Sequence, residues 1–598
     1  RLRGGEDVPP AGEASGDGAD EATMSRLEEY VEMLYEEADD KLRGSALLLR
    51  LARRPENLAA LSANDALLCA LARVLREDGR RHTPLATNLA YVFFCFSSFS
   101  QFHPLLADHR LGSLCMDLVE HELRRHAHWN LELARRAEGD GASPPQDRDW
   151  RKYQGLARRQ EQLLRVCLFV LLNLAEEARS EIKMVNRGLV PMLVDCLERE
   201  QTALLVLAVC FLKKLSVYSE NKAEMGRLPT VARLVPLLGR EPLVGPVLRL
   251  LLNLSFDPEL RVAMVREGLL PRLVQRLHGG RDVPCVLRLL YHMSLDDRSR
   301  SHFAYTDCVP WLVAALLGDA ASPEPLALAL SLAANRRCAQ LFCEGLGALV
   351  ERALGAKDAP LARLLRTVSQ HEGPTRRAFL PHVEALVHAL VRPGAPWELV
   401  LECAGTLANL ELCQAPLPAL WERHGLGAWL GRCLGDAQCP PGTVLSLVAL
   451  LGSAARAHEG CAEAVLRGGL LPPLVALLRA RQEDDAVVLE VAYAFDALLW
   501  HPSTRGPLVA AQEVPGYLLD LVHDRSPEVR RVCDHALGVV AEHDEVWARR
   551  LREARFRCHN AHWLEVAQQP GSAEGDDDDP CVRLLDRADL VSSGGSDP

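Results

Sequence analysis

A short phrase of apolar and polar residues recurs along this chain at a nearly fixed interval. It consists of an apolar run, one polar residue, one apolar residue and one small residue. Its clearest copies are LLNLA ending at Ala175, LKKLS ending at Ser216, LLNLS ending at Ser255 and LYHMS ending at Ser294. The polar residue of each copy, here called the marker, falls at Asn173, Lys214, Asn253, His292 and Ser331, at intervals of 41, 39, 39 and 39 residues. Repeats of this length are typical of stacked helical units that bury their apolar faces only against their neighbours.

Weaker copies of the phrase extend the series in both directions. Their markers are Arg50, Cys95, Thr367, Asn409, Ser453, Ala497 and Val539. The interval from Cys95 to Asn173 is 78 residues, nearly two periods, and the gap holds the charged stretch EHELRRHAHWNLELARR at 120–136. The Gly- and Pro-rich segment 138–149 follows it, which predicts a long charged helix running into a loop.

A second landmark precedes the marker of each clear repeat. It reads GLVPMLV at 188–194, GLLPRLV at 268–274, CVPWLVA at 308–314 and GLLPPLV at 469–475. Glycine can end a helix with a positive φ, and proline is tolerated in the first turn of the next helix. Each unit therefore reads as short helix, tight break, helix, loop and long helix, which is the three-helix armadillo form rather than the two-helix HEAT form.

These patterns predict an all-α fold, an armadillo-repeat superhelical solenoid with disordered acidic termini. The aromatic content is only 5%, so the core is expected to consist mostly of Leu, Val and Ala. We expect one elongated domain, in which a disordered acidic stub at 1–26 begins the chain. It is followed by N-terminal helical or armadillo repeats at 27–119, a charged helix and Gly/Pro-rich insertion at 120–150, central armadillo repeats at 151–545, a C-terminal capping helix at 546–567 and a disordered acidic tail at 568–598.

The marker lies near the end of the long third helix, which lines the concave groove of an armadillo superhelix. Residues four apart share a helix face, so stepping back one turn from the markers gives Phe169, Cys210, Arg249, Arg288 and Gly405. The middle of this groove is expected to be basic and to suit an extended or helical acidic segment, or to be a solvated face that binds nothing. The candidate partner-binding residues are Asn173, Lys214, Arg249, Asn253, Arg288, His292 and Asn409. The same pattern places Leu252 on the buried face.

Charge is concentrated at the two ends of the chain. The formal net charge is −12, of which residues 1–29 contribute −5 and residues 565–598 contribute −7. The segment between them is formally neutral and lacks the basic excess of a nucleic-acid-binding protein. The 18 cysteines include no CxxC pair and mostly occupy apolar helical positions, as Cys167, Cys210 and Cys403 do, so we expect buried thiols. No apolar run reaches the ~18 residues of a membrane span, and no direct membrane insertion is expected.

Residues for catalysis, cofactors or metals are not apparent in the sequence. Cys558, His559 and His562 are ligand-type residues, but a structural zinc site needs four ligands and no fourth is near. Gly-rich phosphate loops and the GxSxG elbow are absent from the sequence. We therefore expect no enzyme, no cofactor and no metal site.

Several longer segments are too particular to follow from repeat physics. They include YVEMLYEEADDKLRGSALLL at 30–49, FFCFSSFSQFH at 93–103, FAYTDC at 303–308, SQHEGPT at 369–375 and AEHDEVWARRLREARFRCHNAHWLE at 541–565. From about Tyr30 to Glu565 the chain resembles the kinesin-associated protein family, the non-motor accessory subunits of heterotrimeric kinesin. The 29 residues before Tyr30, the segment VRPGAPW at 391–397 and the C-terminal tail depart from the pattern of that family.

The resemblance implies a non-catalytic scaffold that binds the C-terminal tails of two kinesin motor subunits and connects them to cargo adaptor proteins. It implies microtubule-based and intraflagellar transport, at the microtubule cytoskeleton, in the cytoplasm and in the cilium. The alternative is another armadillo adaptor, for nuclear import or for adhesion and signalling. Import adaptors hold basic peptides with paired Trp and Asn one turn apart, whereas this chain has no Trp at the matching positions and an Arg-lined groove would repel such peptides.

Overall fold

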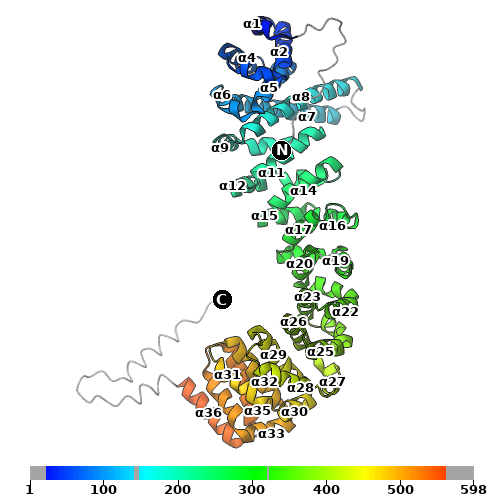
Figure 1. The fold of residues 1–598 in the computed structure, drawn as a ribbon, viewed down its shortest axis with the longest axis vertical. Coiled ribbons are helices and arrows are strands. Elements are labelled where there is room, and N and C mark those ends of the chain that lie inside the picture. The colour runs from blue at the N-terminus through cyan, green and yellow to red at the C-terminus, as the bar shows by residue number, and fades with distance from the viewer. Residues whose placement is uncertain (1–21, 140–146, 319–321, 561–598) are drawn as a thin grey trace, which may run out of the picture. The chain divides into compact units, whose positions relative to one another are not determined.

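The computed structural model describes residues 22–139, 147–318 and 322–560, and these residues contain helices and no strand. The chain divides into two compact units, Arg1–Gly345 (unit 1) and Leu346–Pro598 (unit 2), each a row of stacked helices (Figure 1). The all-α prediction is confirmed for this part of the chain. Of the acidic segments predicted to be disordered, 1–21 and 568–598 lie outside the described residues, and a 3-10 helix, η1 (Met24–Arg26), precedes the first α-helix.

Unit 1 repeats the order of first, second and third helix that the sequence predicts. It begins with α1 (Leu27–Glu32) and η2 (Met33–Tyr35). The third helices are α2 (Ala38–Ala52), α5 (Thr83–Ser97), α8 (Asp147–Leu174), α11 (Thr202–Leu215), α14 (Glu241–Leu254), α17 (Val283–Met293) and α20 (Glu324–Ala333). The first helices are α3 (Pro55–Ser62), α6 (His103–Asp108), α9 (Ala178–Asn186), α12 (Ser219–Arg227), α15 (Pro258–Arg266), α18 (Asp297–Phe303) and α21 (Arg336–Phe342). The second helices are α4 (Asp65–Glu77), α7 (Leu111–Gly139), α10 (Leu189–Cys196), α13 (Thr230–Leu237), α16 (Leu269–His278) and α19 (Cys308–Leu317), and short 3-10 turns lie at η3 (Ser100–Phe102) and η4 (Cys343–Gly345).

Unit 2 is built in the same way. Its second helices are α22 (Leu346–Gly355), α25 (Val383–Val391), α28 (Leu426–Gly435), α31 (Leu471–Ala480) and α34 (Glu513–Asp520). Its third helices are α23 (Ala359–Ser369), α26 (Trp397–Ala408), α29 (Pro441–Ala457), α32 (Asp485–Trp500) and α35 (Pro527–Ala541). Its first helices are α24 (Pro374–Ala378), α27 (Leu417–Arg423), α30 (Glu459–Arg467) and α33 (Pro502–Ala511), with η5 (Leu380–His382), η6 (Leu412–Gln414) and η7 (Leu521–His523) between elements and α36 (Glu545–His559) at the end.

The break between first and second helices forms as the landmark predicts. Gly188 and Gly268 precede α10 and α16 with φ of 89° and 71°, in the left-handed region that glycine tolerates best. Pro191 and Pro271 are each the third residue of the following helix, where the missing N–H leaves no intrahelical bond unmade. The two helices can therefore turn sharply against each other within one repeat.

The core of each unit lies between successive third helices and the helices that flank them. In unit 1 each third helix contacts the third helix of the next repeat, and Figure 1 shows α11, α14, α17 and α20 following one another in this way. Leu250, Leu251 and Leu254 of α14 are fully buried. Burying one leucine contributes about 2 kcal/mol, so this packing is the main favourable term in the fold. Cys167 and Cys403 are buried free thiols, whereas Cys210 is half-buried.

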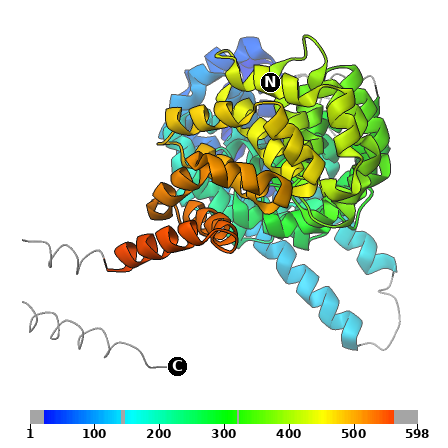
Figure 2. The ribbon, with the colours of Figure 1, turned by 90° about the horizontal axis from the view of Figure 1, so that it is seen from below.

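The charged stretch at 120–136 lies in the long helix α7, which contacts α8 along its length. α7 runs to Gly139 and α8 begins at Asp147, so helix extends into both ends of the segment 138–149 that the sequence predicts as a loop. Figure 1 shows the two helices next to each other, and in Figure 2 both, in cyan, extend beyond the neighbouring helices of unit 1. The turn between them lies outside the described residues. Buried polar contacts join the two helices, since Gln160 Nε2 donates to Glu122 Oε2 at 2.6 Å.

A helix that crosses a membrane needs about 20 consecutive, predominantly apolar residues. In the described ranges no single helix has the necessary length and apolar character. Three bent helix pairs meet the criterion together by length and composition, namely Pro55–Ser62 with Asp65–Glu77, Thr83–Ser97 with Ser100–Asp108, and Glu459–Arg467 with Leu471–Ala480.

Candidate protein-binding face

The marker side chains connect neighbouring repeats. Seven of them reach sideways from their third helix to a small residue at the end of the preceding third helix, each forming one rung of a polar ladder. The rungs are Asn173 Nδ2 to Ser97 Oγ (3.1 Å), Lys214 Nζ to the Ala175 carbonyl (2.5 Å), Asn253 Nδ2 to Ser216 Oγ (3.0 Å), His292 Nδ1 with Ser255 Oγ (2.8 Å), Ser331 Oγ to the Ser294 carbonyl (3.2 Å), Asn409 Nδ2 to Ser369 Oγ (3.0 Å) and Ser453 Oγ to the Ala408 carbonyl (3.1 Å).

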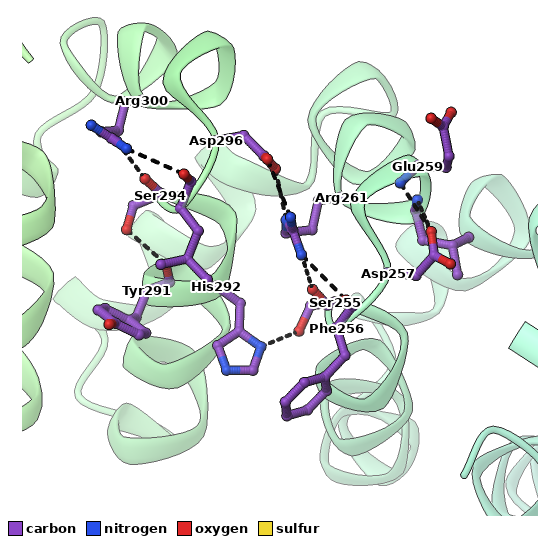
Figure 3. Close-up of polar contacts among 12 residues, drawn as sticks. Ser255, Phe256, Asp257, Glu259, Arg261, Tyr291, His292, Ser294, Asp296 and Arg300 are labelled. Carbon is purple, nitrogen blue, oxygen red and sulfur yellow. Dashed lines mark hydrogen bonds and ion pairs between the residues drawn. The ribbon is translucent and has the colours of Figure 1, made fainter. Parts of the chain in front are cut away.

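The ends of the third helices are capped by side chains of the next first helix (Figure 3). The Arg261 guanidinium donates to the Ser255 carbonyl at 2.9 Å and also pairs with Asp296, at 2.7 Å from Nε to Oδ2. Arg300 repeats the arrangement one repeat later, donating to the Ser294 carbonyl at 2.6 Å. These bonds satisfy carbonyls that have no partner inside a helix and fix the chain where it leaves α14 and α17.

Three neighbouring third helices each present one stripe of residues spaced by four and three positions. The stripes are Cys210, Lys214 and Val217 in the repeat of α11, Arg249, Asn253 and Phe256 in the repeat of α14, and Arg288, His292 and Leu295 in the repeat of α17. The last residue of each stripe lies in the turn just after the helix. Residues at these spacings lie on one side of a helix. The middle residue of each stripe is the marker and is bonded to the preceding repeat, so the two outer residues remain as the exposed part of the face.

The N-terminal end of these stripes is basic. Arg249 lies on α14, which packs against α11 and α17, and its positive charge favours the ionised form of both Cys210 and Cys285. Burial nevertheless raises the pKa of both thiols, because it outweighs the attraction of the nearby cations. Arg249 is exposed, and Arg288 is exposed with a single ion pair to Glu324 at 3.1 Å. Exposed pairs of this kind contribute little to stability and leave the charge accessible to a partner.

His292 is neutral over a wider pH range than an ordinary histidine. Burial lowers its pKa, and the Arg261 guanidinium lowers the pKa further. Its ring also packs edge-on against Phe256, with 4.5 Å between ring centroids. The side chain therefore acts as part of the packing between two repeats.

The seven candidate residues are divided between the two units. Six of them lie in unit 1, and Asn409 lies in unit 2. Five carry rungs of the ladder, and Lys214 also forms an ion pair with the buried carboxylate of Glu181. Arg249 and Arg288 are the two whose side chains extend from the face. Partner binding by these seven residues stays a prediction.

Unit 2 connects its third helices partly with buried charges. The carboxylate of Asp496 on α32 is 8% exposed, accepts from His535 Nδ1 at 2.7 Å and lies 3.6 Å from Arg456 Nη1. The Arg456 guanidinium also lies 3.8 Å from the centre of the Trp500 ring. These contacts join α29, α32 and α35, so the charges of Asp496 and Arg456 are already paired inside the chain.

A second ion pair with a buried carboxylate in unit 2 explains why residue 405, one turn before Asn409, is a glycine. Arg366 Nη1 on α23 lies 3.5 Å from Glu402 Oε2 on α26. A Cβ at Gly405 would collide with the Arg366 guanidinium, so only glycine leaves room for this cation to reach Glu402. Gly405 therefore occupies the position that corresponds to Arg249 and Arg288, and the side chain of Arg366 fills the space beside it.

No metal or cofactor site emerges from the part of the chain that the structure describes. No group of three or more His, Cys, Asp or Glu side chains there could hold a metal ion. His562 lies outside the described residues, and nothing is described of the side chains of Cys558 and His559 at the end of α36. What the face offers is hydrogen-bonding, cationic and apolar contact for another protein.

Sequence reasoning missed the apolar end of the stripes. Val217, Phe256 and Leu295 are large apolar residues that are exposed at the same place in three successive repeats. A signal was present, because each is the first residue after the small residue of the phrase and the three recur at intervals of 39. The capping arginines Arg261 and Arg300 recur at the same interval.

Comparison with known proteins adds a family and a fold. A family model described as "Kinesin-associated protein (KAP)" matches residues 6–590, nearly the whole chain. A solved structure described by the words "A conserved phosphorylation switch controls the interaction between cadherin and beta-catenin in vitro and in vivo" is 16% identical with a TM-score of 0.58, covering 86% of this chain and 99% of that chain. An engineered protein is 20% identical with a TM-score of 0.51, covering 64% of this chain and 96% of its own.

A designed armadillo repeat protein in complex with the peptide (KR)4 is 19% identical with a TM-score of 0.33, covering 39% of this chain and 99% of its own. At these identities the structural matches concern the fold alone. The armadillo-repeat prediction is confirmed, and so is the resemblance that the segments between Tyr30 and Glu565 indicate.

Proposed function

Because the chain belongs to the kinesin-associated protein family, we propose that it is the accessory scaffold that binds the C-terminal tails of two kinesin motor subunits and connects them to cargo adaptor proteins. The family is a kinesin-associated adaptor family, and both the family and the armadillo fold are non-catalytic kinds of protein. The family also points to a microtubule-related location in the cytoplasm. The proposal extends to microtubule-based and intraflagellar transport, and hence to the cilium.

The observation that carries the proposal is the family match over residues 6–590, joined to a fold made of stacked repeats. Stacked repeats present long surfaces on which several partners can bind at once, as a scaffold between motors and cargo requires. Phosphate-binding loops for ATP hydrolysis are not apparent in the sequence, so the proposal assigns hydrolysis to the motor subunits.

The direct test is co-purification with the motor tails. The full chain is mixed with the C-terminal tails of the two heterotrimeric kinesin motor subunits, singly and together, and run by size-exclusion chromatography at physiological salt. We expect one stable peak that contains all three chains. A folded, helical sample that elutes apart from both tails would overturn the proposal.

The groove residues can be tested in the same assay. We expect the double variant Arg249→Glu, Arg288→Glu to bind the tails at least about tenfold more weakly, because it reverses the charge at the basic end of two stripes. The matched control is Arg227→Glu, Arg298→Glu, which makes the same charge change at exposed positions in the first helices α12 and α18. Equal tail affinity in the two double variants would remove Arg249 and Arg288 from the binding face.

A further inference from the structure

We propose that the C-terminal ends of α11, α14 and α17 form a docking surface for an acidic amphipathic helix. The surface consists of an apolar row, defined as Val217, Phe256 and Leu295, and a basic pair, defined as Arg249 and Arg288. The identification of this helix with part of a motor tail rests on the proposed function. The chemistry of the surface does not depend on that identification.

The apolar row is more exposed than its residue types normally are. The exposed fractions are 70% for Val217, 64% for Phe256 and 47% for Leu295, and the three residues occupy equivalent positions in adjacent repeats. Single exposed apolar residues are common on proteins, but a row of them at one register of a repeat is a contiguous feature of the kind that marks an interaction site. Tyr291, one turn before Leu295 on α17, is 36% exposed and extends the row on that helix.

The backbone beneath the apolar row is held in place before any partner arrives. Arg261 Nη1 donates to the carbonyls of Ser255 and Phe256, at 2.9 and 3.4 Å. Arg300 donates in the same way to the carbonyls of Ser294 and Leu295, at 2.6 and 3.2 Å. Figure 3 shows the bonds that Arg261 and Arg300 make beside Phe256 and Ser294. A surface that is already ordered loses less conformational entropy on binding.

The ladder argues that the occupant is a helix rather than an extended strand. An extended segment leaves backbone N–H and C=O groups that the face must satisfy, which polar side chains at the marker positions would have to do. Here Asn253 Nδ2 donates to Ser216 Oγ at 3.0 Å and to the Lys213 carbonyl at 3.3 Å, and His292 Nδ1 is bonded to Ser255 Oγ. These marker side chains are therefore already engaged within the chain. A helix satisfies its own backbone and needs only side-chain contacts.

The spacing of the row agrees with a helical occupant. Packed helices lie about 8–10 Å apart, so successive residues of the row are separated by about that distance. One heptad of an α-helix advances about 10.5 Å, so residues seven apart on the partner meet successive members of the row. About two heptads span Val217, Phe256 and Leu295.

The positive charges of Arg249 and Arg288 indicate that the partner helix carries acidic residues beside its apolar stripe. Arg249 and Arg288 lie on α14 and α17, seven residues before Phe256 and Leu295 in the turns that follow these helices. Both cations therefore lie about two helical turns from the apolar row, on its N-terminal side. Glutamate or aspartate beside the apolar stripe of the helix would form charge-assisted hydrogen bonds with these guanidinium groups. A lysine-rich helix of the same shape would be repelled.

The test uses a synthetic probe and the full chain. The probe is a fluorescent peptide of about 14 residues with leucine at the a and d positions and glutamate at the e and g positions, followed by anisotropy and by circular dichroism. The controls are the same peptide with lysine in place of each glutamate and a version with a central proline, which cannot form a continuous helix. The row variant carries Val217→Ser, Phe256→Ser and Leu295→Ser, and the control variant carries Ile182→Ser and Val262→Ser.

Ile182 and Val262 are matched controls because they are 59% and 52% exposed but lie on the first helices α9 and α15. We expect saturable binding of the glutamate peptide with a gain of helicity, a loss of at least about tenfold in the row variant and no change in the control variant. Both control peptides should fail to bind. Equal binding to wild type and row variant, binding of the lysine peptide, or binding of the proline peptide would each overturn the proposal.

The motor tails then separate this inference from the proposed function. If the glutamate peptide binds but the tails do not co-elute, the proposed function fails and the docking surface stands. If the tails co-elute equally with wild type and row variant, the tails bind elsewhere and the assignment of this surface to them is wrong. Concentration-dependent dimerisation that the row variant abolishes, without peptide binding, would identify a second copy of the chain as the occupant and overturn the proposal.

Discussion

The two units connect their third helices with partly different chemistry. In unit 1 the marker side chains on α8 to α20 are asparagine, serine, lysine or histidine, and each bonds to a serine or a backbone carbonyl of the preceding repeat, as Asn253 does with Ser216. Unit 2 has such rungs at Asn409 and Ser453, and it adds buried carboxylates at other positions of the repeat, as Asp496 with His535 and Arg456. The repeat therefore fixes which helices are neighbours and leaves the position and chemistry of their polar contacts free to vary.

This difference decides which charges remain for a partner. In unit 2 Arg366 and Arg456 are turned towards buried carboxylates, and Gly405 makes room for one of them. In unit 1 neutral rungs connect several of the helices, so Arg249 and Arg288 are left on the surface beside exposed apolar residues. Removing each kind of contact in turn measures how much it contributes to the stability of its unit, as distinct from the binding of a partner.

Apolar packing is the feature that both units share, and breaking it should have the largest effect. We expect Leu251→Ala to lower the free energy of unfolding by about 3 kcal/mol, because the side chain is fully buried between repeats and its loss leaves a cavity. The neighbouring change Leu252→Ala should cost less than about 1 kcal/mol, because Leu252 is only half-buried. Denaturant unfolding followed by circular dichroism measures both, and equal losses would show that the register of α14 is misplaced.

Leu252 also shows where prediction from sequence ends. The period, the three-helix unit and the glycine and proline break before α10 all follow from local patterns. The full burial of Leu252 was predicted wrongly, because its position on α14 is only half-buried, and a run of leucines does not reveal which of them are fully buried. Local sequence patterns predict where helices lie better than they predict which side of a helix is buried.

The same limit applies to the candidate site. Sequence periodicity identifies the stripe of Arg249 and Asn253, since both follow from the marker. It could not reveal that the Asn253 amide is bonded to Ser216, because the two residues are 37 positions apart and meet only through the stacking of repeats. It could not identify Gly405 as the space for Arg366 for the same reason.

The buried carboxylate of unit 2 should have the next largest effect. We expect Asp496→Ala to destabilise the chain by about 2 kcal/mol, because it removes the shared partner of Arg456 and His535. The value is below that of a fully buried pair, since both partners retain some exposure. The control is Asp534→Ala, whose exposed pair with Arg555 should contribute no more than about 0.5 kcal/mol. If the two variants melt alike, unit 2 does not depend on buried charge.

A single neutral rung should contribute less. We expect Asn253→Ala in unit 1 and Asn409→Ala in unit 2 each to cost about 1 kcal/mol, because each removes a similar amide-to-serine bond of 3.0 Å. Equal costs would show that the neutral rung works alike in both units, so that their difference lies in the buried charges alone. Both costs are measured by the same denaturant titration. If both are near zero, the ladder forms because the helices pack together and does not itself stabilise the fold.

The smallest expected effect is the acid sensitivity of unit 1. Burial, with the positive charge of Arg199, lowers the pKa of His126 on α7 from 6.5 to about 4. The unfolded chain therefore binds this proton at a higher pH than the folded chain does, so stability is full above pH 6.5 and falls as the pH drops towards about 4. We expect His126→Gln to reduce this fall by less than about 1 kcal/mol, since the partly exposed ring is screened by solvent. Denaturant titrations of both proteins between pH 7 and pH 4, within the range of these two pKa values, give the difference. A variant that loses stability in parallel with the wild type would show that other groups in unit 1 or unit 2 control the response to acid.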